Sequence, residues 1–337
     1  MLKDNSNVFI IAEISANHNN DFDTCVKTIE SIAKSGADAV KVQTYKPESL
    51  TLDVNNEYFG PKKDGPWKGC TPYQVFSEGA MPYEWQPKLK EIANNWGLEF
   101  FSSPFDIEGV DFLESIGVNL YKVASFEITD IPLIEYIASK GKPMIISTGV
   151  AELCDIDMAV RACRKVGNND ITLLKCTSEY PAPVDKANLL TINNLRETFS
   201  VKVGVSDHTM GIIVPVVSVA IGATVVEKHF ILNRKLGGPD SSFSMEPEEF
   251  TSMVKAVREA EKSLGKISYE ISDNDKSRRR SLFLVEDIKA GEKITEKNIR
   301  SIRPAFGLHP KYYRQVLGKT VNRDIKKGTP LFWELFT

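Results

Sequence analysis

The sequence predicts a parallel eight-stranded α/β barrel over residues 1–265, followed by a linker and a small β-rich domain. Three observations predict this fold: eight short apolar runs recur, segments with helical spacing separate them, and each run ends in polar residues. Strands that alternate with helices are typical of a parallel sheet, and eight such units close into a barrel. A doubly wound sheet is the alternative, but no glycine-rich dinucleotide turn follows the first run.

The predicted strands are short runs rich in apolar and β-branched residues. In order they are VFIIAEI (8–14), AVKVQT (39–44), EFFSSP (99–104), LYKVAS (120–125), PMIIST (143–148), ITLLKCT (171–177), VKVGVSD (201–207) and VVEKHF (225–230). The segment 23–36 has apolar residues spaced by about 3.6 and ends at a glycine, which predicts a helix. The same pattern predicts helices over 106–116, 151–166, 212–221 and 246–264.

Each predicted strand is apolar in its first part and polar in its last two or three residues. The polar residues are Glu13, Lys41 with Gln43, Ser102 with Ser103, Lys122 with Ser125, Ser147, Lys175 with Thr177, Ser206 with Asp207, and Glu227 to His229. In α/β barrels the carboxyl ends of the strands build the active site. A buried polar cluster costs free energy unless it is satisfied, so a structural protein would gain nothing from eight of them. The pattern therefore favours an enzyme.

One connection is much longer than the others. Residues 45–83 follow the second predicted strand, and loops of this length are usually functional or disordered. Its aromatic residues, together with one that follows it, predict a packed lid: Tyr58, Phe59, Trp67, Tyr73, Phe76, Tyr83 and Trp85.

The composition changes after residue 265. Residues 266–280 are polar and charged, which predicts a linker, and the run Arg278 to Arg280 is interpreted as part of this solvated segment. Beyond it, DIKAGEKIT (287–295) and DIKKGTPLF (324–332) are near-repeats of a strand end, a glycine turn and a strand. Residues 281–337 are therefore predicted to form a compact β-rich domain close to the lower size limit for independent folding.

Charge, hydropathy and cysteine content exclude several classes of protein. The formal net charge is −3, so there is no global basic field for nucleic acid. No apolar run reaches 18 residues, and the amino-terminal segment lacks a signal-peptide pattern. The five cysteines form no CxxC pair and leave one over, which favours reduced thiols and a cytoplasmic protein.

Two histidines end neighbouring predicted strands. His208 follows the seventh and His229 ends the eighth, and adjacent strands lie about 4.8 Å apart. The two imidazoles could therefore share one divalent ion and leave positions open for catalysis, with Asp207 or Glu227 as an orienting group. Strand alternation sends Glu227 and His229 to one side and Lys228 to the other, where it is interpreted as a structural charge. The alternative is two unrelated, hydrogen-bonded histidines.

Two lysines lie inside predicted strands. Lys41 and Lys122 are flanked by apolar residues, so each must pair with an anion or shift its pKa. With serines on other strands they would suit a phosphate and a carboxylate, and the alternative is that they snorkel at the barrel rim. Glu13 is a candidate acid, base or water-orienting group, with a salt bridge to Lys41 as the alternative. Weaker candidates in loops after the strands are Glu127, Tyr180 and Asp240.

Nearly the whole chain resembles the sialic acid synthase family. The matching pieces are IAEISANHNN, AVKVQTYKPESLT, FFSSPFD, YKVASFE, ISTG, KCTSEYPAP, VGVSDHT, EKHF, GGPDSSFSM and RPAFGLHP. The resemblance implies a (β/α)8 TIM barrel joined to an antifreeze-like (SAF) domain. It also implies that the enzyme condenses phosphoenolpyruvate with an amino-sugar aldehyde, giving a nine-carbon nonulosonic acid and phosphate.

The resemblance also implies roles for individual residues. His208 and His229 would hold the metal, manganese with magnesium as the alternative, and Glu13 would lie beside the attacking water. The phosphoenolpyruvate contacts would be Lys41, Ser103, Lys122, Ser125, Ser147 and Ser206. The sugar contacts would be Glu127, Tyr180 and Asp240. Arg303 would enter the barrel of a partner subunit, which implies a homodimer with swapped C-terminal domains.

Some pieces depart from typical N-acetylneuraminate synthases. The forms SANHNN, FSSPF, ASFEITD and FGLHP resemble the branch of the family that makes pseudaminic acid. Phe126 beside Glu127 would place apolar surface in the sugar pocket, which suits a 6-deoxy sugar. The expected co-substrate is therefore 2,4-diacetamido-2,4,6-trideoxy-L-altrose, and the alternative is an N-acetylneuraminate or legionaminate synthase. More distant alternatives are a metal-dependent hydrolase barrel and a carbohydrate- or ice-binding protein that uses the C-terminal unit.

Overall fold

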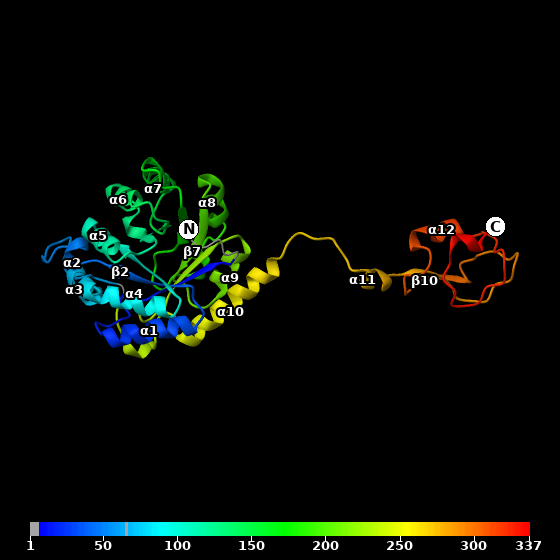
Figure 1. Cartoon of the computed structure of the whole chain (residues 1–337), viewed down its shortest axis with the longest axis horizontal. Helices are drawn as coiled ribbons and strands as arrows, with labels where there is room; N and C mark the ends of the chain where they lie inside the picture. Colours follow the sequence, from blue (N-terminus) through cyan, green and yellow to red (C-terminus); the bar gives the residue numbers. More distant parts are fainter. Residues whose placement is uncertain (1–6, 65–66) are drawn as a thin grey trace. The chain divides into compact units, whose positions relative to one another are not determined.

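The computed structural model describes residues 7–64 and 67–337. The chain divides into two compact units, of which the first ends at Gly265 and the second spans Lys266–Thr337. In the first unit eight parallel strands form a closed barrel in the order β1 to β8 (Figure 1). The parallel barrel that the sequence predicts is therefore confirmed.

The barrel strands lie within the eight predicted apolar runs. They are β1 (Phe9–Glu13), β2 (Ala39–Thr44), β3 (Glu99–Pro104), β4 (Tyr121–Val123), β5 (Met144–Ser147), β6 (Ile171–Cys176), β7 (Lys202–Asp207) and β8 (Val225–His229). The barrel closes where β8 pairs with β1, in a register that places Glu13 opposite His229. The fourth strand is shorter than predicted, because the chain turns into the 3-10 helix η2 (Ser125–Glu127).

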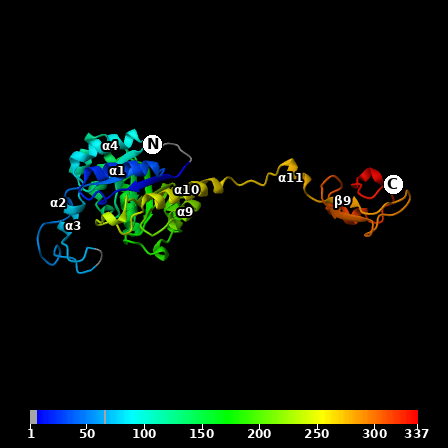
Figure 2. The ribbon, with the colours of Figure 1, turned by 90° about the horizontal axis from the view of Figure 1, so that it is seen from below.

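The barrel is surrounded by helices. The longer ones are α1 (Phe22–Lys34), α4 (Gln86–Asn95), α5 (Ile107–Ser115), α6 (Ile131–Ser139), α7 (Leu153–Lys165), α8 (Thr191–Phe199), α9 (Ile213–Ala220) and α10 (Pro247–Leu264). α1 packs beside α4, and α9 beside α10 (Figure 2). Aspartate side chains cap three of the helices by accepting backbone N–H bonds, which satisfies donors that have no partner inside a helix. They are Asp21 for α1, Asp106 for α5 and Asp130 for α6.

Alternation along the strands divides the apolar residues into two cores. Residues that face outward pack against the helices in one large core, which includes Ile10, Val40, Phe100 and Val226. Residues that face inward fill the lower part of the barrel in a second core: Ile11, Ala39, Phe101, Leu120, Ile145, Leu174 and Val225. Burying a large apolar side chain stabilises the fold by about 1.5–3 kcal/mol. The inner core closes the barrel beneath the position that the polar strand ends occupy.

The long connection after β2 is packed at its two ends and exposed between them. It contains α2 (Pro47–Leu50), α3 (Pro72–Gly79) and η1 (Tyr83–Trp85), and residues 65–66 lie outside the described part. The ring of Phe76 lies 6.1 Å from that of Tyr45, and the ring of Trp85 lies 5.6 Å from that of Phe22. Tyr58, however, is 77% exposed, so the predicted packed lid is wrong for this residue.

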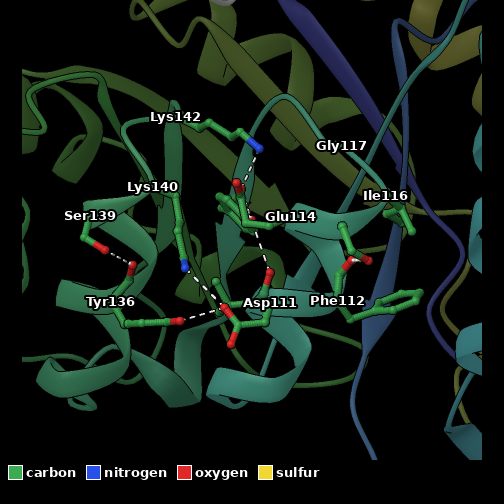
Figure 3. Close-up of polar contacts among 12 residues, drawn as sticks. Asp111, Phe112, Glu114, Ile116, Gly117, Tyr136, Ser139, Lys140 and Lys142 are labelled. Atoms are coloured by element: carbon green, nitrogen blue, oxygen red, sulfur yellow. Dashed lines mark hydrogen bonds and ion pairs between the residues drawn. The ribbon is translucent and has the colours of Figure 1, made fainter.

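A polar network ties α5 to α6 near the amino-terminal ends of β4 and β5. The Tyr121 hydroxyl donates to Glu114. The Lys142 ammonium donates to the same carboxylate (Figure 3). The Tyr136 hydroxyl donates to Asp111 over 2.6 Å, and the Lys140 ammonium lies 3.2 Å from the same carboxylate oxygen. These bonds lie at the end of the barrel opposite the polar strand ends, where contacts stabilise the fold and take no part in catalysis.

The second unit has its own apolar core and an internal pseudo-symmetry. β9 (Ser281–Leu284) pairs antiparallel with β10 (Ile299–Ile302). The predicted near-repeats pair with each other, because Ile288 and Ile325 exchange backbone hydrogen bonds of 2.9 Å. Lys289 pairs with Asp324 and Lys326 with Asp287, the equivalent positions of the two repeats. Both repeats turn at a glycine, but the flanking residues form isolated bridges instead of the predicted strands.

The segment between the barrel and β9 is mostly irregular. It contains one short helix, α11 (Asp273–Ser277), which the sequence did not predict. The predicted solvated arginine run is only partly free, because Arg280 donates to the Ser301 carbonyl over 2.8 Å and Arg278 lies 3.7 Å from Asp275. Among the described residues, no helix is both long enough and apolar enough to cross a membrane.

Candidate active site

The interior of the barrel is apolar at the level of the inner core and becomes polar two residues further along each strand. Because side chains alternate, the residue two positions after each inner-core residue also points into the barrel. On seven strands these positions carry Glu13, Lys41, Ser103, Lys122, Ser147, Cys176 and Glu227. On β7, Ser206 lies two positions after Gly204, which faces the inner-core residues Leu174 and Val225, and all eight polar residues are buried. We call this set the polar layer. The structure therefore brings together seven polar residues that the sequence singled out on seven strands, and adds Cys176 from the eighth.

Two lysines and two glutamates pair inside the polar layer. Lys41 Nζ lies 2.7 Å from Glu13 Oε2 and 3.8 Å from Glu227 Oε1. Lys122 Nζ lies 3.3 Å from the same Glu227 oxygen, to which the Ser206 hydroxyl donates over 3.1 Å. The salt bridge from Glu13 to Lys41 is therefore present. The snorkelling alternative is wrong, because both lysine side chains are buried.

Burial and pairing shift the pKa values of these groups in different directions. Burial raises the pKa of Glu13 to about 7, although Lys41 opposes this shift. Burial also lowers the pKa of Lys122, against the attraction of Glu227. For Lys41, burial lowers the pKa, but the neighbouring Glu13 and Glu227 raise it more. A carboxyl group with a pKa near neutrality can exchange a proton with a substrate at physiological pH.

The serines of the site leave hydrogen-bonding capacity unused. Ser103 Oγ and Ser147 Oγ are buried and have no partner in residues 7–64 and 67–337. Ser125 Oγ accepts a hydrogen bond of 3.1 Å from the Gly149 backbone. A Cβ on Gly149 would lie 2.2 Å from Ser178 Oγ, so only glycine leaves space at this point. Free hydroxyl donors beside two ammonium groups suit a bound anion.

The two predicted histidines lie side by side above the polar layer. The centroids of the His208 and His229 rings are 5.3 Å apart. His208 Nδ1 lies 2.9 Å from the Thr177 carbonyl oxygen. A carbonyl can only accept, so in the neutral ring the proton is on Nδ1 and the lone pair is on Nε2. His229 is buried, and its Nδ1 has no hydrogen-bond partner among the described residues.

This histidine pair fits a divalent metal that keeps positions open. Burial lowers the pKa of His229 well below its ordinary value, and His208 and Lys41 add to the effect, so the ring is neutral as a ligand must be. Within the described part of the chain, no group of three or more His, Cys, Asp or Glu side chains is arranged to hold a metal. Two protein ligands leave positions for water and substrate, as catalytic sites require.

The predicted orienting groups for the histidines are wrong. Asp207 accepts from Lys228 and from Thr209, so it lies on the outer side of the barrel wall. Glu227 points inward but pairs with the two lysines of the polar layer. Thr177 orients His208 instead, and Asp240 Oδ2 lies 3.8 Å from His229 Nδ1. Both groups come from loops, whose path the strand pattern does not predict.

Aromatic side chains wall the histidine pair. The Tyr180 ring centroid lies 4.4 Å from that of His208. The Phe243 ring lies 5.0 Å from His229 and 5.1 Å from Tyr180. The structure thus brings Tyr180 and Asp240 next to the histidines, as a shared site requires. Sequence reasoning missed Phe243, which lies in the quoted segment GGPDSSFSM but has no distinguishing pattern.

Glu127 lies at the start of the loop after β4, in η2. Burial raises its pKa to about 7, with Lys122 opposing the shift, and its Oε2 has no partner in the described ranges. Phe126 beside it is 62% exposed. Glu127 therefore faces the same interior as Lys122, whereas Phe126 lies at the open surface of the mouth.

Cys176 is the member of the polar layer that sequence reasoning missed. Its Sγ lies 3.9 Å from His208 Nδ1. Burial raises the pKa of the thiol, but the hydrogen bond and charge of His208 lower it by more. The pKa therefore falls below its ordinary value, to about 7. The same contact raises the pKa of His208 against the effect of its burial. The alternation from Leu174 to Cys176 would have placed this thiol inside the barrel.

Arg303 lies in the second unit, in the loop after β10. The loop is anchored by its backbone, since Ser281 Oγ donates to the Pro304 carbonyl over 2.8 Å and accepts from Gly307. Arg303 is exposed and Phe306 is 63% exposed. The loop therefore presents a cation and an aromatic ring at the surface of this unit.

Lys228 is expected to hold the outer wall of the barrel together. Its ammonium lies 2.5 Å from Asp207 Oδ2, and both side chains are 1% exposed. Lys228→Met would leave the Asp207 charge buried and unpaired, at a cost of about 3–5 kcal/mol in the free energy of unfolding. Urea denaturation followed by circular dichroism measures this loss.

Lys88→Met is the matched control, because its ion pair with Glu91 is more than half exposed on both sides. It should change the free energy of unfolding by about 0.5 kcal/mol or less. A loss at Lys228 as small as at Lys88 would contradict the structural role of this buried pair.

Comparisons with known proteins extend over both units. Residues 28–269 match the NeuB family, and residues 279–337 match the SAF domain, which confirms the predicted C-terminal domain. Pseudaminic acid synthase of Helicobacter pylori is 43% identical, over 96% of this chain and 96% of that protein. N,N'-diacetyllegionaminic acid synthase of Legionella pneumophila is 37% identical, over 97% of this chain and 94% of that protein.

A solved structure gives the same similarity in three dimensions. The crystal structure of N-acetylneuraminic acid (sialic acid) synthetase from Leptospira borgpetersenii, in complex with citrate, matches with a TM-score of 0.72 at 31% sequence identity. The match covers 80% of this chain and 89% of that chain.

Proposed function

Because the chain belongs to the NeuB family, we propose that its barrel condenses phosphoenolpyruvate with an amino-sugar aldehyde to give a nonulosonic acid and phosphate. We propose 2,4-diacetamido-2,4,6-trideoxy-L-altrose as the sugar and pseudaminic acid as the product. The identity to a pseudaminic acid synthase, 43%, is higher than that to a legionaminic acid synthase, 37%. The observation that best supports this reaction is the buried layer of lysines and serines. It lies directly beneath two histidines that can bind a metal as neutral rings.

The polar layer supplies the binding groups for phosphoenolpyruvate in this proposal. The phosphate and carboxylate of phosphoenolpyruvate need cations and hydroxyl donors. The polar layer offers both in a buried setting where charge interactions are strong. The proposed contacts are Lys41, Ser103, Lys122, Ser147 and Ser206 of this layer, together with Ser125 from the loop after β4. In the free chain Glu13 and Glu227 already neutralise the two lysines. Binding of the anion must therefore exchange these pairings for contacts with substrate oxygens.

The histidines hold the metal in this proposal. His208 and His229 would bind a divalent ion, which we propose to be manganese with magnesium as the alternative, and the ion would polarise the sugar aldehyde as a Lewis acid. The chain's own contribution is orientation. Thr177 fixes the His208 ring through its carbonyl, and the walls formed by Tyr180 and Phe243 shield both rings from water.

Glu13 is the proposed proton acceptor. In the reaction C3 of phosphoenolpyruvate bonds to the aldehyde carbon, whose oxygen takes a proton. Water then adds at C2 and loses a proton, and the C2–O bond to phosphate breaks. Glu13, buried with a pKa of about 7, can take the proton that water loses. Glu127, Tyr180 and Asp240 would contact the sugar, since they lie around the same mouth.

We propose that the active site is completed in a homodimer. Arg303 and Phe306 are exposed on the second unit, and such a cation could meet the sugar at the mouth of a partner's barrel.

The domain limits that go with this proposal are 1–265 for the barrel, 266–280 for the linker and 281–337 for the SAF domain. All five cysteines are free, which supports a cytoplasmic location.

Removal of the second unit is expected to leave a folded but poorly active barrel. The barrel has a core of its own that ends with α10, so a chain truncated after residue 270 should stay soluble. Its rate of phosphate release should fall at least about 10²-fold, the effect of losing one charge-stabilising group in an active site. Arg303→Ala in the full chain should reproduce most of this loss. Full activity of the truncated barrel would refute the role given to Arg303.

The proposed function is tested by incubation of the full chain with phosphoenolpyruvate, manganese and a panel of amino-sugars. Phosphate release and the mass of the product are measured for each sugar. We expect the altrose derivative to react fastest and to give a nine-carbon acid. Faster turnover of N-acetylmannosamine, or of the legionaminic acid precursor, would overturn the choice of sugar. Absence of phosphate release with every sugar would overturn the reaction itself.

A further inference from the structure

Lys175, near the end of β6, is a half-buried lysine that has no carboxylate within 4.0 Å in the described residues. Its ammonium instead donates to the Cys176 carbonyl over 2.7 Å and lies 3.5 Å from Thr177 Oγ1. A partly desolvated charge without a counter-ion is costly, and burial lowers the pKa of this ammonium. The ammonium group therefore holds two neighbouring residues, Cys176 and Thr177, in place.

These two residues lead directly to His208. The Thr177 carbonyl is the partner of His208 Nδ1, at 2.9 Å. Thr177 is held from its other side, where its hydroxyl donates to the Lys186 carbonyl over 3.2 Å. Lys175 thus lies one hydrogen-bonded residue away from the imidazole that we propose as a metal ligand.

The Thr177 carbonyl and the Cys176 thiol compete for His208 Nδ1, so the position of the carbonyl decides which of them pairs with the ring. Cys176 Sγ lies 3.9 Å from the same His208 Nδ1. If Nδ1 donates to the carbonyl, Nε2 keeps its lone pair and can bind a metal. If the thiol donates to Nδ1 instead, the ring proton moves to Nε2 and blocks that nitrogen as a ligand. A small displacement of residues 176–177 would decide between the two tautomers.

The space behind His208 is compatible with this arrangement. A cavity of about 10 Å³ is lined by Lys175, Thr177, His208 and Thr209, among others. This is about the smallest cavity that admits one water molecule, which could take the third donor of the ammonium. Lys175 can therefore be satisfied without a carboxylate while it holds the backbone.

We propose that Lys175 is a positioning residue for His208: it holds residues 176–177 so that the Thr177 carbonyl, and not the Cys176 thiol, pairs with Nδ1. The proposal rests on the proposed function, because it gives His208 the role of a metal ligand. Its consequence is that metal affinity depends on a side chain that touches neither the metal nor the substrate, as outer-sphere partners of metal ligands commonly do.

The test compares Lys175→Met with the wild-type full chain in two measurements. Titration with Mn²⁺, followed by electron paramagnetic resonance, should show binding weakened about tenfold or more. Nitrogen-15 NMR of His208 in the metal-free protein, at alkaline pH, should change from a single Nδ1–H tautomer to a mixture. Lys175→Arg, which keeps the donors, should restore both. Lys175→Gln carries the test if the methionine variant does not fold.

Lys202→Met is the matched control, since Lys202 begins the neighbouring strand β7 and pairs with Asp170 at the other end of the barrel. It should leave both measurements unchanged. An unaltered His208 tautomer in Lys175→Met, with Mn²⁺ affinity within about twofold of the control, would overturn the proposal. If the wild type binds no Mn²⁺, the proposed metal role fails, while the tautomer measurement still decides the role of Lys175.

Discussion

Replacement of His229 by alanine is expected to reduce phosphate release by about 10³-fold or more while the barrel stays folded. His229 is a buried side chain whose Nδ1 has no partner in the described residues, so the loss of the ring breaks no hydrogen bond that the fold uses. It removes one of the two proposed metal ligands. A metal held by this pair would polarise the aldehyde as a Lewis acid and contribute several kcal/mol of transition-state stabilisation, which corresponds to this loss in rate.

The measurement combines phosphate release at saturating manganese with Mn²⁺ binding and thermal unfolding. His309→Ala is the control, because His309 is exposed in the second unit and its Nδ1 accepts only from the backbone of Lys311. It should leave turnover and metal binding unchanged. If His229→Ala keeps more than about a tenth of the activity, or if chelator-treated wild type stays active, metal catalysis at this pair is refuted.

Replacement of Lys122 by methionine is expected to weaken the use of phosphoenolpyruvate far more than the use of the sugar. Lys122 is 2% exposed, and its ammonium lies 3.3 Å from Glu227. Without it, the bound anion loses one of two cations, and the Glu227 charge is left to Lys41 alone. We expect KM for phosphoenolpyruvate to rise by about 10²-fold, consistent with about 2–3 kcal/mol for a buried charge-assisted contact.

Steady-state kinetics with each substrate varied in turn measures this asymmetry. Lys142→Met is the control, since it also removes a Lys–Glu pair from the barrel, but between Lys142 and Glu114 at the opposite end. It should leave both KM values unchanged. A larger rise in KM for the sugar than for phosphoenolpyruvate would contradict the position assigned to Lys122.

The proposed roles of these residues depend on a layered interior that the sequence predicts well. Lys41, Ser103 and Lys122 each follow an inner-core residue by two positions, so alternation alone directs them into the barrel. The histidines are predicted for the same reason, because neighbouring parallel strands bring their carboxyl ends to one face. The salt bridge from Glu13 to Lys41 was one of the alternatives that the sequence offered, but the pairing of Glu227 with both lysines could not be predicted. Glu227 contacts both lysines only because β8 closes the barrel against β1.

Residues on loops were harder to predict than residues on strands. Thr177 orients His208 and Asp240 lies near His229, yet both residues belong to loops that follow the strands. Asp207 looked equivalent to Glu227 in the sequence, but the opposite parity directs it outward to Lys228. The period of two distinguishes these carboxylates once the strand bounds are known. It gives no information where the chain turns.

The sequence by itself determined the eight-stranded barrel, the second β-rich unit and the set of polar strand ends, because these depend on local periodicity and on the order of the elements. Only the tertiary structure decided that Glu227 pairs with both lysines, that Cys176 completes the polar layer, and that Thr177 sets the orientation of His208. These contacts join residues from different strands and loops over distances of less than 4 Å, from 2.9 Å for Thr177 with His208 to 3.9 Å for Cys176 with His208. Their formation depends on side-chain geometry in the closed barrel, which no local pattern in the sequence specifies.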